Sequence, residues 1–178
     1  MGPRGNGTRR GCGCMSKQPT SVALALELAV HAAVATVDDP EYPGVSIVDL
    51  GLLESIEVDD EQGAVRIGLI PTFSGCPALQ IIKDDVAAAA AEVAGVDRVE
   101  VEWLTTPVWS VSRISAETRK VLASEFTVAV RIGRDAPPCP RCGGPTHEQS
   151  MFGPSKCRSI NRCEACSEAV EVMRGFDS

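Results

Sequence analysis

The sequence predicts an α+β fold, in which a small mixed sheet with packed helices is followed by a C-terminal, four-cysteine, zinc-ribbon-like module. Three observations support this prediction. Apolar residues alternate with polar ones in several short segments and recur at helical spacing in others. Two Cys-x-x-Cys pairs stand near the C-terminus, at the spacing of a metal ribbon. The 178 residues suffice for one domain and a small second module.

The charge divides the chain into three zones and excludes some functions. Residues 1–21 hold four basic residues and no acid, residues 22–138 hold 19 acids against 8 bases, and residues 139–178 are balanced. We therefore expect a flexible basic tail over 1–21, an α+β domain over 22–134 and a metal-binding module over 137–176. The net charge of −7 argues against a nucleic-acid partner, because such binding needs a basic face. No apolar stretch is long enough to span a membrane, so no membrane partner is expected either.

The N-terminal tail contains a pattern that imitates an export signal. Two arginines at positions 9–10 precede an apolar stretch over 22–35, as in a twin-arginine signal. Glu27 interrupts that stretch, and Cys-x-x-Cys pairs suit a reducing compartment better than an oxidising one. We therefore expect a cytoplasmic protein. Met15 is an alternative start, so it stays open whether residues 1–14 belong to the protein.

The first half of the α+β domain predicts a helix, a loop and a hairpin. Ser21 is a suitable N-cap, and the two prolines that follow the helix force the chain into an extended loop. An acidic turn that ends in Gly63 joins the two strands. In chain order we expect a helix over 22–36, a loop over 38–43, and strands over 53–58 and 64–71.

The second half predicts a helix, a strand, a short helix and a last strand. Pro77 fits the first turn of a helix, where a missing N–H costs nothing, and Gly95 ends that helix. The next segment alternates apolar and charged residues and is a half-buried strand. In chain order we expect a helix over 77–94, a strand over 98–103, a helix over 115–124 and a strand over 126–132.

Cys76 is the residue of this domain that could carry chemistry. At the N-cap or in the first turn of the helix that begins at Pro77, unpaired backbone N–H groups would stabilise its thiolate. The functional interpretation is an accessible, low-pKa metal ligand or nucleophile, and a small buried residue is an equally good alternative. The two histidines, His31 and His147, give no obvious base for a nucleophile.

The C-terminal module carries the clearest pattern in the chain. Cys139, Cys142, Cys163 and Cys166 form two Cys-x-x-Cys pairs that predict a closed tetrahedral metal site, and Gly143-Gly144 provides a tight turn. The expected strands are 146–151, 156–162 and 168–174. So small a module needs the metal for its folding energy. Zinc is the expected metal, and an all-thiolate site also suits iron.

A fifth thiol of the module, Cys157, stays unassigned. It is either a buried or free cysteine beside the ribbon, which we favour, or a ligand to a second centre.

Several motifs together resemble a known family. Asp39-Pro40-Glu41, residues 47–52 and Thr72-x-x-Gly75-Cys76-Pro77 resemble the pattern of the SufT-like family of iron–sulfur cluster assembly proteins. A narrower group of proteins shares three further features, which are Pro107-Val108-Trp109, Cys157-Arg158 and the four-cysteine tail. The combined pattern is similar to the D proteins of phenylacetyl-CoA epoxidase systems, which are accessory components of bacterial multicomponent oxygenases.

The resemblance implies a non-catalytic accessory or maturation role for such an oxygenase. It maps the family's cysteine onto Cys76 as an iron or iron–sulfur contact, with Thr72, Asp39 and Glu41 as further site residues. It implies zinc or an iron–sulfur cluster at the four-cysteine site and transient iron or iron–sulfur at Cys76. The implied partners are oxygenase subunits and iron–sulfur assembly proteins. A thiol-dependent enzyme that uses Cys76 as nucleophile or redox thiol remains the alternative.

Overall fold

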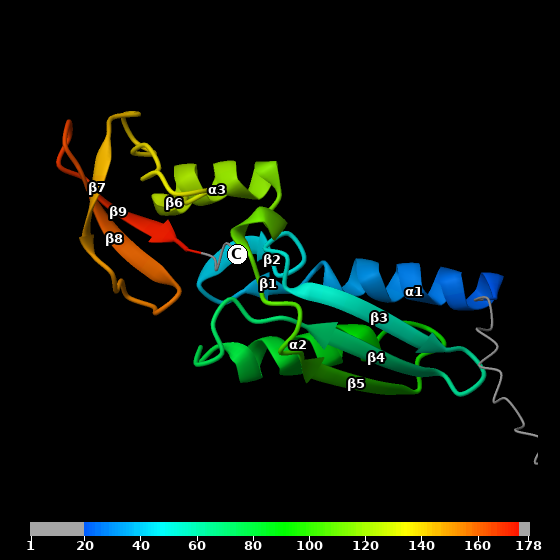
Figure 1. Cartoon of the computed structure of the whole chain (residues 1–178). Helices are drawn as coiled ribbons and strands as arrows, with labels where there is room; N and C mark the ends of the chain where they lie inside the picture. Colours follow the sequence, from blue (N-terminus) through cyan, green and yellow to red (C-terminus); the bar gives the residue numbers. More distant parts are fainter. Residues whose placement is uncertain (1–19, 175–178) are drawn as a thin grey trace, which may run out of the picture.

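The computed structural model describes residues 20–174, so the predicted tail up to residue 19 and the alternative start at Met15 lie outside the described residues. In chain order the elements are α1 (Ser21–Val34), β1 (Asp38–Asp39), β2 (Tyr42–Ser46), β3 (Leu53–Asp59), β4 (Ala64–Leu69), α2 (Leu79–Ala91), β5 (Arg98–Trp103), the 3-10 turn η1 (Val111–Arg113), α3 (Ala116–Phe126), β6 (Val128–Val130), β7 (Thr146–Ser150), β8 (Arg158–Cys163) and β9 (Ala169–Met173) (Figure 1). The predicted α+β fold is confirmed. None of the helices in the described range is long and apolar enough to cross a membrane.

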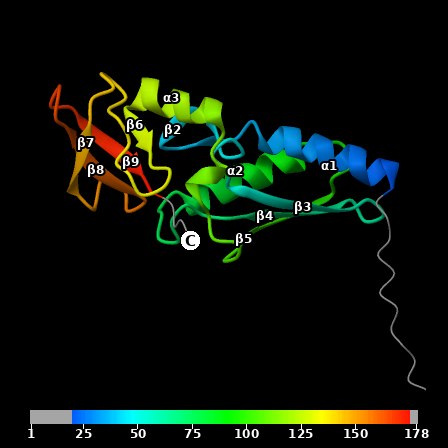
Figure 2. The same ribbon diagram turned by 45° about the horizontal axis from the view of Figure 1, so that its top comes forward.

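The first domain is built on a mixed three-stranded sheet in the order β3-β4-β5. β3 runs antiparallel to β4, and β5 runs parallel to it. The parallel pair needs a crossover connection, and α2 provides it. α1 and α2 cover one face of the sheet (Figure 2). An aliphatic core lies between these layers; it includes Val30, Val34, Ile67, Leu69, Ile82 and Val86.

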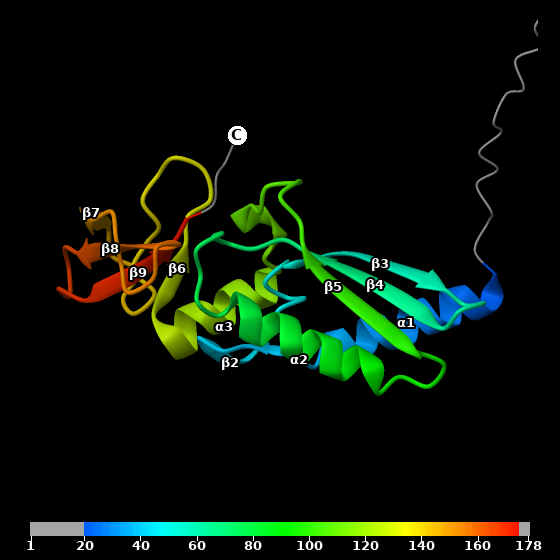
Figure 3. The same cartoon turned by 90° about the horizontal axis from the view of Figure 1, so that it is seen from below.

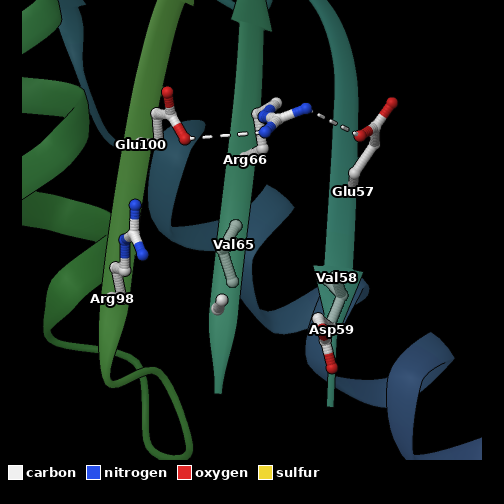
Figure 4. A pocket seen from close by; sticks show the side chains of 8 residues that line it. Glu57, Val58, Asp59, Val65, Arg66, Arg98 and Glu100 are labelled. Carbon is white, nitrogen blue, oxygen red and sulfur yellow. Dashed lines mark ion pairs between the residues drawn. The ribbon is translucent and has the colours of Figure 1, made fainter. Parts of the chain in front are cut away.

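The opposite face of this sheet is open and charged. Arg66 on the central strand lies between Glu57 and Glu100 on the two outer strands, at 3.9 and 3.7 Å (Figure 4). A shallow hollow of about 320 Å³ lies among these side chains. All three are more than half exposed, so each pair contributes little to stability. The charged side chains on this face are therefore solvated.

The N-terminal ends of α1 and α2 differ from the prediction. Thr20, not Ser21, caps α1, because its Oγ1 accepts a hydrogen bond from the N–H of Ala23 at 3.0 Å. α2 begins at Leu79 rather than at Pro77. The chain before α2 makes turns instead, in which Cys76 N–H donates to the carbonyl of Phe73 at 3.2 Å. Cys76 therefore precedes the helix and is not part of its first turn.

The loop predicted over residues 38–43 is a short hairpin. β1 and β2 pair antiparallel across the proline-containing turn, with a register shift between Asp38 and Asp39. The aspartate side chains make this turn possible. Asp39 Oδ1 accepts the N–H of Glu41 at 2.8 Å, and Asp38 Oδ2 accepts the N–H of Gly44 at 2.7 Å. Such local side-chain bonds satisfy amides that a short ladder leaves unpaired.

The last strand of the predicted domain joins the other sheet. β6 pairs parallel with β9, and the ribbon sheet has the order β6-β9-β8-β7. The three predicted ribbon strands are present, each within about two residues of its predicted bounds. Val128 of β6 and Met173 of β9 are buried in the same core cluster as Tyr42 of the hairpin. The ribbon is thus packed against the first domain (Figure 3).

Candidate metal sites

Four cysteines converge at one end of the ribbon sheet. Cys139 and Cys142 lie in the turn before β7, Cys163 ends β8, and Cys166 lies in the turn before β9. The sulfur-to-sulfur distances are 3.8 Å for Cys139–Cys166, 3.5 Å for Cys142–Cys163 and 3.4 Å for Cys142–Cys166. A tetrahedral ion held by four thiolates at about 2.3 Å needs sulfurs about 3.8 Å apart. The arrangement therefore fits the predicted four-thiolate site.

The backbone around these cysteines is shaped to hold a metal. The carbonyl of Cys139 accepts the N–H of Gly143 at 2.8 Å, and the carbonyl of Cys163 accepts the N–H of Ser167 at 3.1 Å. Each Cys-x-x-Cys pair is thereby closed into a turn. The N–H of Cys166 also points at the sulfur of Cys163 and lowers the pKa of that thiol to about 6. This favours the thiolate form at Cys163, whereas hydrogen bonding with the other cysteines raises the pKa of Cys166.

Gly144 leaves room for the sulfurs. A Cβ atom there would stand 2.8 Å from the Cβ of Ala165 and 3.3 Å from the sulfurs of Cys142 and Cys163. The sequence suggested only that this glycine helps to make a tight turn. The structure shows that it also permits close approach of the backbone to the metal ligands.

A second group of ionisable side chains gathers where the first domain meets the ribbon. Cys76 lies in the loop between β4 and α2, and Asp39 and Glu41 lie on the β1–β2 hairpin. The negative charges of Glu41, Cys157 and Asp39 all act to raise the pKa of Cys76. The structure thus brings three of the four residues suggested by the family motif within electrostatic reach of one another. Cys157, which the sequence left unassigned, joins them.

Cys76 does not have the low pKa that a helix N-terminus would give it. Burial, the largest effect, raises the pKa of its thiol, and the nearby negative charges raise it further. The N–H of Ala78 opposes these effects but does not outweigh them. The prediction of a thiol with a low pKa was therefore wrong, because α2 begins three residues after Cys76 and presents only one amide to the sulfur.

Thr72 lies on the same loop as Cys76, but it lines a groove that Cys76 does not line. With Phe73, Trp103 and Trp109 it borders a groove of about 320 Å³. Among the described residues, no hydrogen bond links its side chain to Cys76. Its role at the Cys76 site therefore rests on the family motif alone.

Like Cys157, Arg158 is a residue of this site to which the sequence analysis gave no role. It begins β8, and only 8% of its side chain is exposed. Its Nη2 donates to Glu41 at 2.6 Å, its Nη1 donates to Glu171, and its guanidinium lies 5.2 Å from the ring centre of Tyr42. Cation–π contact and paired carboxylates compensate for its burial. The Cys157-Arg158 motif pointed to this position but not to its partners.

Fold and sites together define a protein with an iron–sulfur assembly domain followed by a zinc ribbon. Residues 27–103 match the family model of the iron–sulfur cluster assembly protein, and residues 123–174 match the PaaD zinc beta ribbon domain. The ribbon match begins before β6, in agreement with the pairing of β6 with β9.

The chain belongs to the family of a protein from Escherichia coli (strain K12) that is provisionally named as the D component of 1,2-phenylacetyl-CoA epoxidase. The two are 30% identical over 153 residues, which cover 82% of this chain and 90% of that protein. This confirms the family suggested by the combined motifs.

Other relatives match about half of the chain. The Fe-S protein maturation auxiliary factor YitW from Bacillus subtilis (strain 168) is 37% identical over 91 residues, which cover 51% of this chain and 87% of that protein. The crystal structure of a DUF59 domain from Bacillus anthracis superposes with a TM-score of 0.54 at 33% identity, covering 58% of this chain and 96% of that one. The match to the family model over residues 27–103 and the similarity to YitW relate the first domain to iron–sulfur maturation factors.

Proposed function

We propose that this chain is a non-catalytic accessory protein that assembles or delivers iron or an iron–sulfur unit for a multicomponent oxygenase. The oxygenase would be of the phenylacetyl-CoA epoxidase type, since a relative that spans most of the chain carries that name. The observation that carries the proposal is the position of Cys76, in a domain related to iron–sulfur maturation factors and beside the carboxylates of Asp39 and Glu41.

The environment of Cys76 suits a site that binds iron or an iron–sulfur unit and then releases it. Burial and neighbouring negative charge raise the pKa of Cys76, so its thiol keeps its proton at neutral pH when no metal is bound. A metal must displace that proton, and the proton in turn assists release of the metal. Such competition favours transient over permanent binding. Asp39 and Glu41 would supply oxygen ligands or balance the charge of the cargo, and Thr72 would contribute from the same loop.

The four-cysteine site would have a different role. Its sulfurs are already arranged for a tetrahedral ion, so we assign it a resident metal, with zinc preferred and an iron–sulfur cluster as the alternative. That metal would hold β7, β8 and β9 together and, through Arg158, keep the ribbon against the β1–β2 hairpin. The proposed partners are oxygenase subunits and iron–sulfur assembly proteins.

A cytoplasmic location is part of the proposal. The six cysteines that the structure describes are all free, and four of them are arranged for metal binding rather than for disulfides. Such thiols need a reducing compartment.

A thiol-dependent enzyme is less well supported. His31 is exposed on α1, and Nδ1 of His147 lies 3.5 Å from a carboxylate oxygen of Glu164 in the ribbon. Neither histidine is among the groups that act on the pKa of Cys76. With a raised pKa and no base beside it, Cys76 is a poor nucleophile at neutral pH.

The proposal is tested with Cys76→Ala, co-expressed with the subunits of a phenylacetyl-CoA epoxidase. We expect the variant to fold and the oxygenase to contain less iron than with the unmodified chain. Ser74→Ala, an exposed position on the same loop, is the matched control and should leave the iron content unchanged. Equal oxygenase iron with Cys76→Ala and with the control would refute the proposal.

A further inference from the structure

We infer that Cys157 is the second thiolate ligand of the Cys76 metal site, so that the first domain and the ribbon each supply one sulfur, with the buried hydroxyl of Tyr42 facing the bound metal's ligands. This inference rests on the proposed function, since it starts from Cys76 as a metal ligand. The cargo it implies is a thiophilic divalent cation such as Fe²⁺.

The residues on both sides of Cys157 touch the first domain. Lys156 Nζ lies 5.7 Å from the ring centre of Phe73, on the same loop as Cys76. Arg158 donates to Glu41 on the hairpin. Cys157 is therefore held between two contacts with the elements that carry the Cys76 site. The loop before β8 and the loop after β4 also lie side by side in views from two directions (Figures 1 and 3).

Both thiols remain reachable at this contact. Cys76 and Cys157 are free and half-buried, whereas two of the four ribbon cysteines, Cys139 and Cys163, are fully buried. The negative charge of a Cys157 thiolate is among the causes that raise the pKa of Cys76, which places the two sulfurs within each other's electrostatic field. Two such thiols on facing loops can accept one metal ion between them.

Tyr42 provides an independent observation. Only 3% of its surface is exposed, and its hydroxyl is buried without a hydrogen-bond partner in the part of the chain that the structure describes. Burial raises the pKa of this phenol, the nearby guanidinium of Arg158 opposes that rise, and negative charges on Cys157 and Glu41 raise the pKa further. The hydroxyl is therefore close to the same anionic group. An unpaired buried hydroxyl is costly, and a donor beside thiolates and carboxylates is satisfied when these groups are arranged around a metal.

Ser155 orients the sulfur of Cys157. Arg158 Nε donates to Ser155 Oγ at 2.7 Å, and Ser155 Oγ lies 3.2 Å from Cys157 Sγ. A guanidinium is only a donor, so the serine hydroxyl accepts from it and keeps its own proton for the sulfur. A thiolate ligand retains such a hydrogen bond when it binds a metal. The same arginine thus holds Glu41 and, through Ser155, Cys157.

The potential negative charge around Cys76 and Cys157 favours binding of a cation. Cys76, Cys157, Asp39 and Glu41 are potential anions, and Arg158 is the cation whose partners lie among them. Binding of a divalent ion forms two metal–sulfur bonds and releases the two thiol protons to solvent, with no change of oxidation state. Thiolates prefer Fe²⁺, Co²⁺ or Zn²⁺ over Mg²⁺ or Ca²⁺.

The inference is tested on the full, reduced chain without oxygen, after the ribbon has been loaded with one zinc ion. Co²⁺ is then titrated as a spectroscopic probe, since it does not displace zinc from the ribbon. We expect a second metal site with thiolate-to-cobalt absorption. Cys76→Ser and Cys157→Ser should each weaken it at least tenfold, while Ser74→Ala should not. Tyr42→Phe should weaken it about threefold to tenfold, the usual effect of one lost hydrogen bond.

The outcomes separate this inference from the proposed function. If Cys157→Ser binds Co²⁺ like the unmodified chain and Cys76→Ser does not, the shared site is wrong and the function of Cys76 stands. The shared site is also wrong if no second ion binds, or if Cys76→Ser has no effect on Co²⁺ binding. In either case, the iron content of the co-expressed oxygenase alone decides whether the proposed function is correct. Circular dichroism of each variant, with zinc retained at one ion per chain, shows that lost binding does not reflect unfolding.

Discussion

Arg158, the first residue of β8, donates a 2.6 Å hydrogen bond to Glu41 on the β1–β2 hairpin, 117 residues earlier in the chain. This ion pair joins the ribbon to the acidic motif beside Cys76. Because Arg158 also binds Glu171 on β9, its position depends on the ribbon being folded. A metal bound by the ribbon would therefore be physically linked to the geometry near Cys76.

Removing the guanidinium should reveal this link. Arg158→Met leaves Glu41 and Glu171 without their partner in a partly buried place, and we expect a loss of about 3 kcal/mol in the free energy of unfolding. Urea unfolding measures it. Arg162→Met, at an exposed position of the same strand, is the control and should change stability by less than about 0.5 kcal/mol. Similar losses in the two variants would contradict a specific role for Arg158.

Removing the ribbon metal should unfold the ribbon before the first domain. Two of the four ligands and a few aliphatic side chains make up its small core, so we expect a bound metal to supply most of its folding energy. After chelation we expect the amides of β8 and β9 to lose hydrogen-exchange protection while those of β4 keep it. Cys139→Ser should behave like the chelated protein. Protection of β8 that survives complete metal removal would show that the ribbon folds without metal.

Two adjacent glycines should respond differently to alanine. At Gly144 the added methyl group would meet Ala165 and two ligand sulfurs, so Gly144→Ala should weaken zinc binding about tenfold or more. At Gly143 no atom lies within 4 Å, and only the positive φ of 72° is strained, at a cost of about 1 kcal/mol in stability. Competition with a chromophoric chelator measures both affinities. Equal affinities in the two variants would mean that crowding of the sulfurs is unimportant.

Asp39→Asn should stabilise the fold at neutral pH. Burial raises the pKa of Asp39 above its usual value of 3.8, so the folded state holds the proton more tightly than the unfolded state. The stability that this provides is complete below pH 3.8 and is lost as the pH rises through the pKa of the folded state. Asparagine avoids that loss and keeps the oxygen that accepts the N–H of Glu41.

The pH dependence of the difference is the measurement. Thermal unfolding should show a higher midpoint for Asp39→Asn than for the unmodified chain at pH 7, and the gap should close near pH 3. Asp38→Asn, at an exposed position of the same hairpin, is the control. A midpoint lowered by Asp39→Asn at pH 7 would show that the carboxylate stabilises the apo protein.

Alkylation should report the state of Cys76 directly. Since burial and the charge of Glu41 raise the pKa of this thiol, its reaction with iodoacetamide should be slow at pH 7 and should accelerate as the pH rises through and beyond the usual value of 9.0. Glu41→Gln removes one of the charges and should move the midpoint of the rate profile to lower pH. Peptide mass spectrometry distinguishes Cys76 from Cys157. A midpoint below the usual value would favour the nucleophile hypothesis instead.

Local patterns were enough for most of the fold. Alternation predicted β5 at its observed bounds, 98–103, and the helix predicted from residue 115 begins at residue 116 as α3. These features depend on neighbours in the sequence. The start of α2 was harder, because a proline at position 77 is compatible with both a first helical turn and a preceding turn. Hydrogen bonding to Phe73 selects the second.

The candidate sites also differ in whether local sequence or tertiary contacts bring their residues together. The sequence by itself determined the four-cysteine site, because its ligands come as two local pairs whose spacing fits a single ion, and it pointed to Cys76, Asp39 and Glu41 through the family motif. Only the tertiary structure decided that β6 joins the ribbon sheet and that Arg158 and Cys157 meet the first domain. Partners this far apart in the sequence are chosen by packing and burial, which depend on the whole chain and leave no periodic trace in the sequence.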